Sequence, residues 1–408
     1  MKRILIFSTA YFPHVGGAEV AVAELTSRMH DIHFDMVTIR LSPSDSHFER
    51  VGSVNVYRVG LFRTRKKFLL KTNKFLFPFL GYAKARMLQH KHRYDAVWSI
   101  MASFGGAASL LFKFFFPNIP YLLTLQEGDS IVDIKKKVKW WMPLFRLIFS
   151  RADLIQVISN HLRLFALEME PRKDVRVIPN GVDIEHFGGE CDEKKISEIK
   201  GLFEKKGAGE KLEGGKELKS ALIVTTSRLV KKNGIDTLID TMRYLPPHVH
   251  LAIIGNGPDW EVLEERASGV ASDRIHFVGF VPFKDISCYL KIADVFVRLS
   301  RSEGFGNSFI EAMAVGLPVV ATNVGGIIDF VKDPNTVGME NATGLLVPPE
   351  KPQLAAKAIT RILEDDKVRN YLKENGKKIA KEYDWNIIAP RMQAIFEELW
   401  KKKALKKL

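Results

Sequence analysis

Residues 302–320 read Ser-Glu-Gly-Phe-Gly-Asn-Ser-Phe-Ile-Glu-Ala-Met-Ala-Val-Gly-Leu-Pro-Val-Val, and no other stretch of the chain says more about its fold. Two carboxylates, Glu303 and Glu311, stand eight positions apart. Between them lie Asn307 and Ser308, residue types that favour helix starts, and apolar residues follow at helical spacing. We therefore expect a loop that leads into a helix N-terminus, whose N–H groups and positive dipole end suit phosphate oxygens. A phosphate seat between two carboxylates fits a ligand that has both a diphosphate and sugar hydroxyls.

The composition is that of a globular protein with an excess of positive charge. The 408 residues are 46% hydrophobic and 26% charged, and the net charge of +14 implies an anionic partner. We find no nucleic-acid-binding motif and expect no nucleic-acid partner. No run of 18 apolar residues predicts a membrane-spanning helix. The two cysteines, Cys191 and Cys288, form no metal-ligand pattern and argue against a disulfide framework, so we expect a reducing, cytoplasmic environment.

Short apolar strands alternate with helical patterns along the whole chain, which predicts an α/β fold with mostly parallel sheets. A stretch rich in Lys, Glu and Gly at 190–219 separates two such halves. We therefore expect two Rossmann-like, doubly wound domains facing across a cleft, where such folds bind ligands. The expected strands are Arg3–Phe7, Phe34–Ile39, Val54–Val59, Ala96–Ile100, Tyr121–Leu125, Leu154–Ile158, Val175–Ile178, Leu222–Thr226, Val249–Ile254, Ile275–Val278, Val295–Leu299 and Val319–Thr322. The expected helices include Ala18–Met29, Phe104–Phe116, Ile235–Arg243, Glu261–Ala267, Ser308–Val315 and Leu354–Leu363.

The stretch at 302–320 resembles the E-x7-E signature of the retaining glycosyltransferases of family 4, and other segments match that family in the same order. These segments are Gly16–Glu19, Leu123–Asp129, Pro179–Asp183, Ser227–Gly234, Gly255–Pro258 and Gly325–Gly326. The resemblance covers nearly the whole chain and implies the two-domain GT-B fold. It implies an acceptor-binding domain at 1–185 and a nucleotide-sugar-binding domain at 186–385. We expect the C-terminal helix, 386–408, to pack back on the first domain.

In the first domain, the resemblance assigns roles to a glycine pair and to a glutamine. Gly16 and Gly17 follow the first strand and open a helix, where a ligand can approach the backbone. A tight turn alone would explain them, but their place in the family order favours a function. Gln126 stands where many relatives have a histidine that contacts the transferred sugar; an amide forms hydrogen bonds but cannot act as acid or base. Glu127 and Asp129 either serve an acceptor hydroxyl or are ordinary polar loop residues.

In the second domain, the resemblance points to the loop after its first strand. Arg228 matches an arginine that holds the donor diphosphate in relatives. The lysine expected directly before Gly234 is replaced by Asn233, and Lys232 is the nearest substitute. Phe280 lies in a segment whose backbone meets the nucleobase in the family, although a plain strand end would also explain it.

The resemblance implies a UDP- or GDP-sugar as donor, with Glu311 on the ribose and Glu303 on the sugar ring. Catalysis would depend on Glu303, Arg228 and Gln126, and transfer would occur on the front face, with the leaving phosphate helping to remove the acceptor proton. No Asp-x-Asp motif and no His/Cys cluster is present, so we expect neither a metal nor a cofactor. The expected donor-binding residues are Gly16, Gly17, Arg228, Lys232, Phe280, Glu303, Gly306, Asn307, Ser308 and Glu311.

Two clusters in the first domain combine cations with aromatic residues, as interfacial membrane segments do. They span Phe62–Leu80 and Lys135–Phe149. Each cation near an anionic leaflet contributes about 1 kcal/mol, so clusters of this size would hold the protein at a membrane surface. The alternative is that the apolar residues are core and the lysines a solvated face. The residues assigned to the membrane contact are Lys66, Lys67, Lys135, Lys136, Lys137, Trp140 and Trp141.

Together these features predict a retaining, metal-independent glycosyltransferase that acts on a lipid-linked or polysaccharide-precursor acceptor at the inner face of the plasma membrane. Two alternatives stay open. One is a membrane-peripheral lipid- or nucleotide-binding protein of the same fold with little catalysis, which the unusual Gln126 and Asn233 motivate. The other is a transferase with a soluble acceptor. The sequence does not specify the donor base, the sugar, the linkage or the oligomeric state.

Overall fold

The computed structural model describes residues 1–60, 67–204 and 220–405, and the chain divides into two compact units. Unit 1 comprises Met1–Gly181 together with Trp385–Leu408, and unit 2 comprises Val182–Asp384. The chain ends of unit 2 lie side by side, because the Val182 N–H donates to the Tyr383 carbonyl oxygen at 2.7 Å. These boundaries lie a few residues from the ones expected from the sequence.

Unit 1 is built on an eight-stranded sheet in the order β3-β4-β2-β1-β5-β6-β7-β8. All neighbouring strands in this sheet are parallel except β3 and β4. Every residue of β5 and β6 is buried, as expected for a parallel sheet with helices on both faces. The strands are β1 (Lys2–Phe7), β2 (Ile32–Ile39), β3 (Phe48–Val51), β4 (Val54–Val59), β5 (Ala96–Ile100), β6 (Tyr121–Leu125), β7 (Leu154–Val157) and β8 (Val175–Val177).

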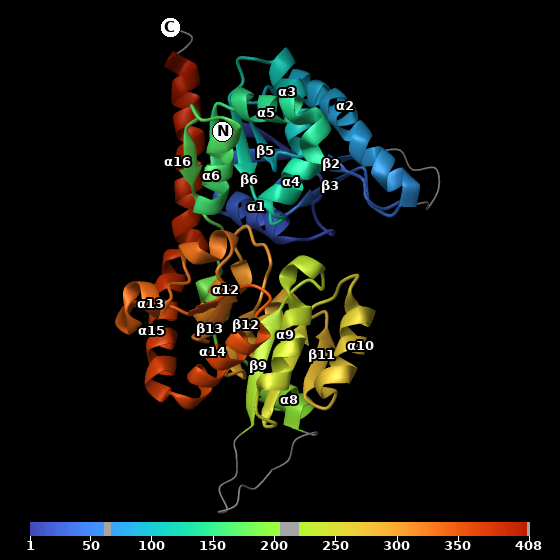
Figure 1. The fold of residues 1–408 in the computed structure, drawn as a ribbon. Coiled ribbons are helices and arrows are strands. Elements are labelled where there is room, and N and C mark those ends of the chain that lie inside the picture. Colours follow the sequence, from blue (N-terminus) through green and yellow to red (C-terminus); the bar gives the residue numbers. More distant parts are fainter. Residues whose placement is uncertain (61–66, 205–219, 406–408) are drawn as a thin grey trace, which may run out of the picture. The chain divides into compact units, whose positions relative to one another are not determined.

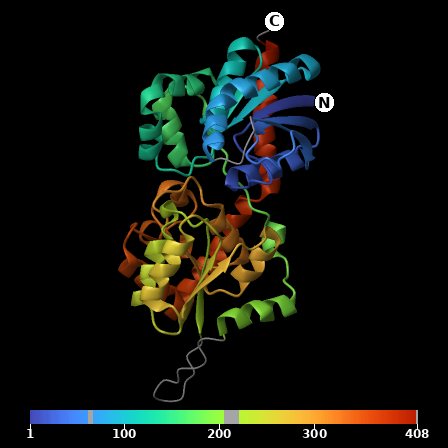
Figure 2. The same ribbon diagram turned by 90° about the vertical axis from the view of Figure 1, so that its right-hand side faces the viewer.

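Helices cover both faces of the unit 1 sheet (Figures 1 and 2). One face packs against α1 and α16, where Trp98 of β5 meets Phe396 with ring centroids 5.4 Å apart. The other face packs against α3, where Phe7 of β1 meets Phe112 at 6.1 Å. Thus the last helix of the chain completes the core of the first unit. The helices of unit 1 are α1 (Gly17–Arg28), α2 (Lys67–His92), α3 (Phe104–Phe115), α4 (Ile131–Val138), the 3-10 helix η1 (Lys139–Trp141), α5 (Met142–Arg151), α6 (Asn160–Met169) and α16 (Trp385–Leu405).

Unit 2 is built on a six-stranded, all-parallel sheet in the order β11-β10-β9-β12-β13-β14. The order reverses between β9 and β12, which is the topological switch point where doubly wound sheets bind ligands. The strands are β9 (Ala221–Thr226), β10 (Val249–Ile254), β11 (Ile275–Gly279), β12 (Val295–Arg298), β13 (Val319–Thr322) and β14 (Leu345–Val347).

Side chains on the two faces of this sheet pack against different sets of helices. Val295 and Val297 join a core formed with α9, α10 and α14, whereas Phe296 packs on Phe309 of α12 with ring centroids 5.3 Å apart. The helices of unit 2 are α7 (Ile184–Gly188), α8 (Glu193–Glu204), α9 (Ile235–Thr241), α10 (Trp260–Ala271), α11 (Phe283–Lys291), α12 (Asn307–Val315), α13 (Pro334–Val337), α14 (Pro352–Glu364) and α15 (Asp366–Glu382), with 3-10 helices η2 (Lys231–Asn233), η3 (Met242–Tyr244), η4 (Gly325–Asp329) and η5 (Met339–Asn341).

The α/β class and the two Rossmann-like units are confirmed, and the expected strands agree with the observed ones to within about two residues at each end. The sequence did not predict the short strands β3 and β14, because segments of three or four residues show no clear alternation of polar and apolar side chains. The helices α2 and α15 were also missed. Helix α2 runs through the first basic-aromatic cluster, whose residue Lys66 lies outside the described residues, as does the side chain of Lys67.

The argument from the sequence against a disulfide framework is contradicted. Cys191 and Cys288 form a disulfide within unit 2, with Cα atoms 5.7 Å apart and 97 positions between them in sequence. The bond joins the segment before α8 to α11. Spacing in the sequence could not predict this pairing, because only the packing of α11 brings the two cysteines together.

Within residues 1–60, 67–204 and 220–405, no helix is both long enough and apolar enough to cross a membrane.

Candidate donor site in unit 2

Four loops at the carboxyl ends of unit 2 strands pack backbone against backbone at glycine positions. A Cβ atom at Gly234 would lie 1.8 Å from the Leu299 carbonyl oxygen, and one at Gly325 would lie 1.8 Å from the Glu303 carbonyl oxygen. Both glycines have positive φ angles, 66° and 56°. Gly255 approaches the backbone after β9 in the same way, with 1.9 Å between its hypothetical Cβ and the carbonyl oxygen of Ser227. Only glycine permits such contacts, so the loops after β9, β10, β12 and β13 form one continuous backbone layer.

The two glutamates flank the start of α12, as expected. Glu303 lies in the loop after β12, and Glu311 lies within the helix. The cap differs from the expectation: Gly306, with φ 100°, is the N-cap residue, while Asn307 and Ser308 are the first helical residues. Gly306 is required there because a Cβ atom would meet the Phe309 ring at 2.8 Å. The first N–H groups of α12 therefore begin directly beside Glu303.

A buried arginine that the sequence reading missed lies between these parts. Arg298, the last residue of β12, is 8% exposed and pairs with the Glu303 carboxylate. Its guanidinium also donates to Ser308 Oγ at 2.8 Å and stacks over the Phe309 ring at 5.1 Å. The signal was present, since Arg298 is a lone charge in an otherwise apolar strand.

Glu311 has a carboxyl group whose acidity is strongly altered. Burial raises the pKa of Glu311 to about 7, and the positive charge of Arg298 counteracts this only in part. Its carboxylate makes no hydrogen bond or ion pair within the described part of the chain. Near neutral pH this residue therefore exists in both protonation states and can accept a hydroxyl hydrogen bond.

The loop after β9 presents Arg228 to solvent, whereas Asn233 turns inward. Asn233 is 7% exposed, and its side-chain amide donates to the Arg228 carbonyl oxygen at 2.7 Å and to Ser227 Oγ at 2.9 Å. Asn233 thus closes the loop instead of supplying the charge that a lysine would bring. Lys232 is half-buried, and its carbonyl oxygen accepts the Arg301 N–H at 2.7 Å.

Phe280 follows β11 and is 77% exposed, directly after Gly279, which has a φ angle of 82°. The backbone of this segment joins the next loop, because the Gly255 N–H donates to the Gly279 carbonyl oxygen at 2.7 Å. An aromatic ring with this exposure is available to stack on a planar ligand group.

The three donor-site or catalytic residues predicted in the first domain lie in unit 1, at the start of α1 and directly after β6. Gly16 is the N-cap of α1, and its N–H donates to the Glu19 carboxylate at 2.8 Å, so this amide already has a partner. Gly17 has open space around it. Gln126 is 8% exposed, and its side chain makes no hydrogen bond within the described residues.

Beside Gln126, Glu127 is more than an ordinary loop residue. Its Oε1 atom accepts the Ala102 N–H at 2.9 Å, and its Oε2 atom is buried without a partner in the described chain. Burial raises the pKa of Glu127 to about 7. Ala102 follows Met101, which has the unusual φ angle of 67°, so Glu127 secures a strained turn after β5.

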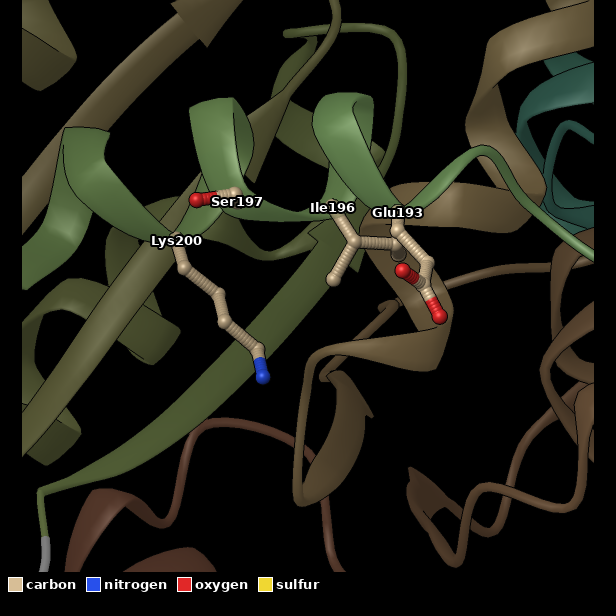
Figure 3. A pocket seen from close by; sticks show the side chains of 4 residues that line it. All are labelled: Glu193, Ile196, Ser197 and Lys200. Atoms are coloured by element: carbon tan, nitrogen blue, oxygen red, sulfur yellow. The ribbon is translucent and has the colours of Figure 1, made fainter.

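Two hollows on the surface of the described chain lie away from the predicted donor-binding residues. One of about 300 Å³ lies along α8, where Glu193, Ile196 and Lys200 project from one side of the helix (Figure 3). Another, of about 440 Å³, is lined by Val132, Lys135, Lys136, Lys139 and Met142. No predicted donor-binding residue lines either hollow. Within the described residues, no group of three or more His, Cys, Asp or Glu side chains is arranged to hold a metal ion.

Comparison with known proteins matches both units. The family model described as Glycosyltransferase Family 4 matches residues 15–186, and that described as Glycosyl transferases group 1 matches residues 210–379. Together these matches span most of the chain, and each covers the greater part of one unit.

Similar proteins share the full length of the chain. An uncharacterised glycosyltransferase of Methanocaldococcus jannaschii, MJ1069, is 26% identical over 97% of this chain and 98% of its own. A GDP-mannose-dependent alpha-(1-6)-phosphatidylinositol monomannoside mannosyltransferase of Mycobacterium tuberculosis is 26% identical over 96% of this chain and 97% of its own. The structure of Anabaena HepE in complex with UDP-glucose is 20% identical, covers 98% of this chain and 100% of its own, and superposes with a TM-score of 0.77. The likeness to HepE shows that the fold is GT-B.

Proposed function

Because the chain belongs to the family 4 glycosyltransferases, we propose that it transfers a sugar from a nucleoside-diphosphate sugar, with retention, to a lipid-linked or polysaccharide-precursor acceptor. The observation that carries the donor proposal is the E-x7-E segment. Two carboxylates flank a helix start at the switch point of the unit 2 sheet, and four loops form a rigid backbone layer around it. UDP-glucose in HepE and GDP-mannose for the mycobacterial relative support a nucleotide sugar as donor.

The proposed roles follow the chemistry of the groups. The first N–H groups of α12 and the exposed Arg228 attract the diphosphate, since a helix start and a guanidinium both favour negative charge. Glu311 accepts hydrogen bonds from the ribose, and Glu303 accepts from the transferred sugar. As the bond to the sugar breaks, negative charge grows on the diphosphate, and fixed positive groups stabilise it. We propose that the leaving phosphate, on the same face of the sugar, takes the proton of the acceptor hydroxyl.

In unit 1, we propose that Gln126 hydrogen-bonds the transferred sugar, because its amide is largely buried yet has no partner in the described chain. Gly17 offers an unobstructed approach to the start of α1 for the donor phosphate or the acceptor. Gly16 contributes only if Glu19 releases its N–H. We further propose that the reaction needs no metal, so that EDTA leaves the turnover rate unchanged.

The donor proposal is tested by thermal shift and by turnover. Of UDP, GDP, UDP-glucose and GDP-mannose, at least one nucleoside diphosphate and a matching sugar nucleotide should raise the melting temperature, because ligands bind the native state. Glu303→Gln and Arg228→Ala should each lower turnover at least tenfold. Glu261→Gln, an exposed glutamate of α10, is the matched control and should keep wild-type turnover. Wild-type turnover in both site variants would refute the assigned roles.

For the acceptor, we propose contact with an anionic membrane through the segment α4–η1–α5, at the cytoplasmic face. Trp140 is 93% exposed, and Leu144 and Leu147 of α5 are also exposed. The cations Lys136 and Lys139 are exposed and form no ion pair within the described residues. This face combines an interfacial aromatic ring with positive charge, as membrane-bound segments do.

Three of the residues expected to contact the membrane, two lysines and a tryptophan, already have partners within unit 1. Lys135 pairs with Glu168 at 2.5 Å, and Lys137 pairs with Asp129 at 2.7 Å, so their charges are balanced locally. Trp141 is half-buried against the Phe145 ring, 5.4 Å between centroids. The contribution to membrane binding is therefore expected chiefly from Lys136, Lys139 and Trp140, at about 1 kcal/mol for each cation.

Liposome flotation tests the membrane proposal. The wild-type protein should float with vesicles that contain anionic lipid and not with neutral vesicles, whereas Trp140→Ala combined with Lys136→Ala should float much less. Lys357→Ala, an exposed lysine of α14, is the control for loss of a single charge. If wild-type protein does not bind anionic vesicles, a soluble acceptor becomes the better proposal.

The Cys191–Cys288 disulfide weighs against the cytoplasmic location, because disulfides are rare in reducing compartments.

A further inference from the structure

We propose that Arg298 is a positioning residue for donor-sugar recognition: it holds one oxygen of Glu303 so that the other can accept a hydrogen bond from the sugar. This inference rests on the proposed function, because it assumes that Glu303 faces the transferred sugar. It adds a residue outside the E-x7-E segment, on the strand before it.

The contacts of Arg298 show a guanidinium held on several sides. Its Nη2 atom pairs with Glu303 Oε2, and its Nη1 atom donates to Ser308 Oγ at 2.8 Å and to the Thr226 carbonyl oxygen at 3.3 Å. Its Nε atom donates to Ser300 Oγ at 3.3 Å. The planar fork therefore ties the loop before α12, the first turn of α12 and the end of β9 to one rigid group.

The two carboxylate oxygens of Glu303 have different surroundings. The Oε2 atom is occupied by Arg298, while the Oε1 atom has no partner among the described residues. The Glu303 side chain is 15% exposed, so part of it still reaches solvent at the edge of the loop layer. A carboxylate with one oxygen held in place accepts a hydrogen bond from a hydroxyl group in a defined direction through the other oxygen. Its side chain then loses little conformational entropy when the ligand binds.

A purely structural role explains Arg298 less well. On its own face of the sheet the next residue of β12 is Phe296, which is fully buried against Phe309, so an apolar residue at 298 could extend this packing. Burying a guanidinium carries a desolvation cost, and replacing a buried ion pair with apolar residues is often neutral or stabilising for a fold. An arginine at this point is therefore expected to serve the orientation of Glu303.

The charge of Arg298 also matters for the diphosphate. Glu303 and Glu311 both lie beside the start of α12, and two unbalanced carboxylates would repel a diphosphate. Arg298 pairs with Glu303 and so balances one of these two negative charges. A lysine at 298 would keep this charge but could not bridge Glu303 and Ser308 at once, so the two effects can be separated by substitution.

The test compares Arg298→Met and Arg298→Lys with wild type in the full-length protein, using titration calorimetry with UDP, GDP, UDP-glucose and GDP-mannose. For Arg298→Lys, the dissociation constant of the sugar nucleotide should rise at least tenfold, while that of the matching nucleoside diphosphate should change less than threefold. Arg298→Met should lose sugar-nucleotide affinity at least as much. Arg266→Met, which removes an exposed arginine paired with Asp240, is the matched control and should change neither constant.

Each outcome decides a different question. If wild type binds none of the four nucleotides, the proposed function fails, and this inference fails with it. If wild type binds but both Arg298 variants keep its preference for the sugar nucleotide over the bare diphosphate, the positioning role alone is refuted. An equal loss for both ligand types in Arg298→Lys would also refute it, because that is the result expected of a structural residue. Should Arg298→Met not fold, Arg298→Lys decides the matter by itself.

Discussion

Replacing Gly325 with alanine places a methyl group where the unit 2 loops leave no room. The Cβ atom would lie 1.8 Å from the Glu303 carbonyl oxygen, whereas ordinary contact begins at 3.4 Å, so the two loops must separate by about 1.6 Å. The φ angle of 56° is itself disfavoured for alanine by about 1–2 kcal/mol. Separation also breaks the hydrogen bond from the Gly326 N–H to the Glu303 carbonyl oxygen, 3.1 Å, which contributes about 1 kcal/mol.

We therefore expect Gly325→Ala to destabilise unit 2 by about 2–3 kcal/mol. For a domain of about 200 residues, this corresponds to a fall in melting temperature of roughly 4–12 °C. Binding should weaken as well, because Glu303 moves with its carbonyl group. Differential scanning calorimetry with and without the best-binding nucleotide measures both effects in one protein preparation.

Gly201→Ala is the matched control for the same change of one hydrogen to a methyl group. Gly201 lies inside α8 of unit 2, has nothing within 4 Å of a hypothetical Cβ, and is not at positive φ. Alanine there should raise stability by about 0.5–1 kcal/mol, because glycine inside a helix costs backbone entropy. If Gly325→Ala leaves both the melting temperature and nucleotide binding as in wild type, the rigid loop layer does not exist as described.

Three further predictions concern single groups in unit 2. Nucleotide affinity should rise as the pH passes through about 7, where Glu311 ionises, and Glu311→Gln should flatten this dependence in calorimetric titrations at pH 6, 7 and 8. Asn233→Lys should lower the melting temperature by several degrees without improving nucleotide affinity, because it removes two buried hydrogen bonds, one of them to the Arg228 carbonyl oxygen. Cys191→Ser should lower stability by about 4 kcal/mol, since the bond to Cys288 closes a long loop, and wild type should melt earlier with reductant than without it.

Each of these predictions has a result that would contradict it. For Glu311, the same pH dependence in Glu311→Gln as in wild type would assign the titration to the ligand or to another residue. The pH dependence of stability provides a second check. The raised pKa of Glu311 means that the native state holds more protons between about 4.5 and 7, so stability falls as pH rises through this window. Glu311→Gln should reduce that fall and leave the part that Glu127 of unit 1 contributes. For Asn233, tighter binding in the lysine variant would show that the loop tolerates the family residue. For the cysteines, two free thiols titrated in the denatured, unreduced protein would rule out the disulfide.

Much of the fold follows from local patterns. Most strands of both sheets were predictable because runs such as Val249–Ile254 are apolar apart from His250 and are bounded by turn residues. Helix α2 was not, because the pattern of Lys67–His92 mixes cations and aromatic residues and has no clear apolar stripe. The edge strand β3 pairs antiparallel with β4 through only four residues, too few for a reliable pattern.

The candidate site was predictable to the same extent. Glu303, Gly306 and Glu311 stand close together in the sequence, so their arrangement around a helix start follows from local spacing. The position of Arg228 followed from its place after a strand. The role of Asn233 did not, since a side chain at that position can point to the ligand or into the loop, and its partners decide which.

The amino-acid sequence by itself determined the α/β class, the two units and the segment that surrounds the proposed diphosphate site, because these depend on residues within one or two turns of each other. Tertiary structure alone decided two other features: the pairing of Arg298 with Glu303 and the bond between Cys191 and Cys288. Each of these joins groups through packing of separate elements. A side chain acquires its partner, and with it its charge state and direction, only when those elements meet.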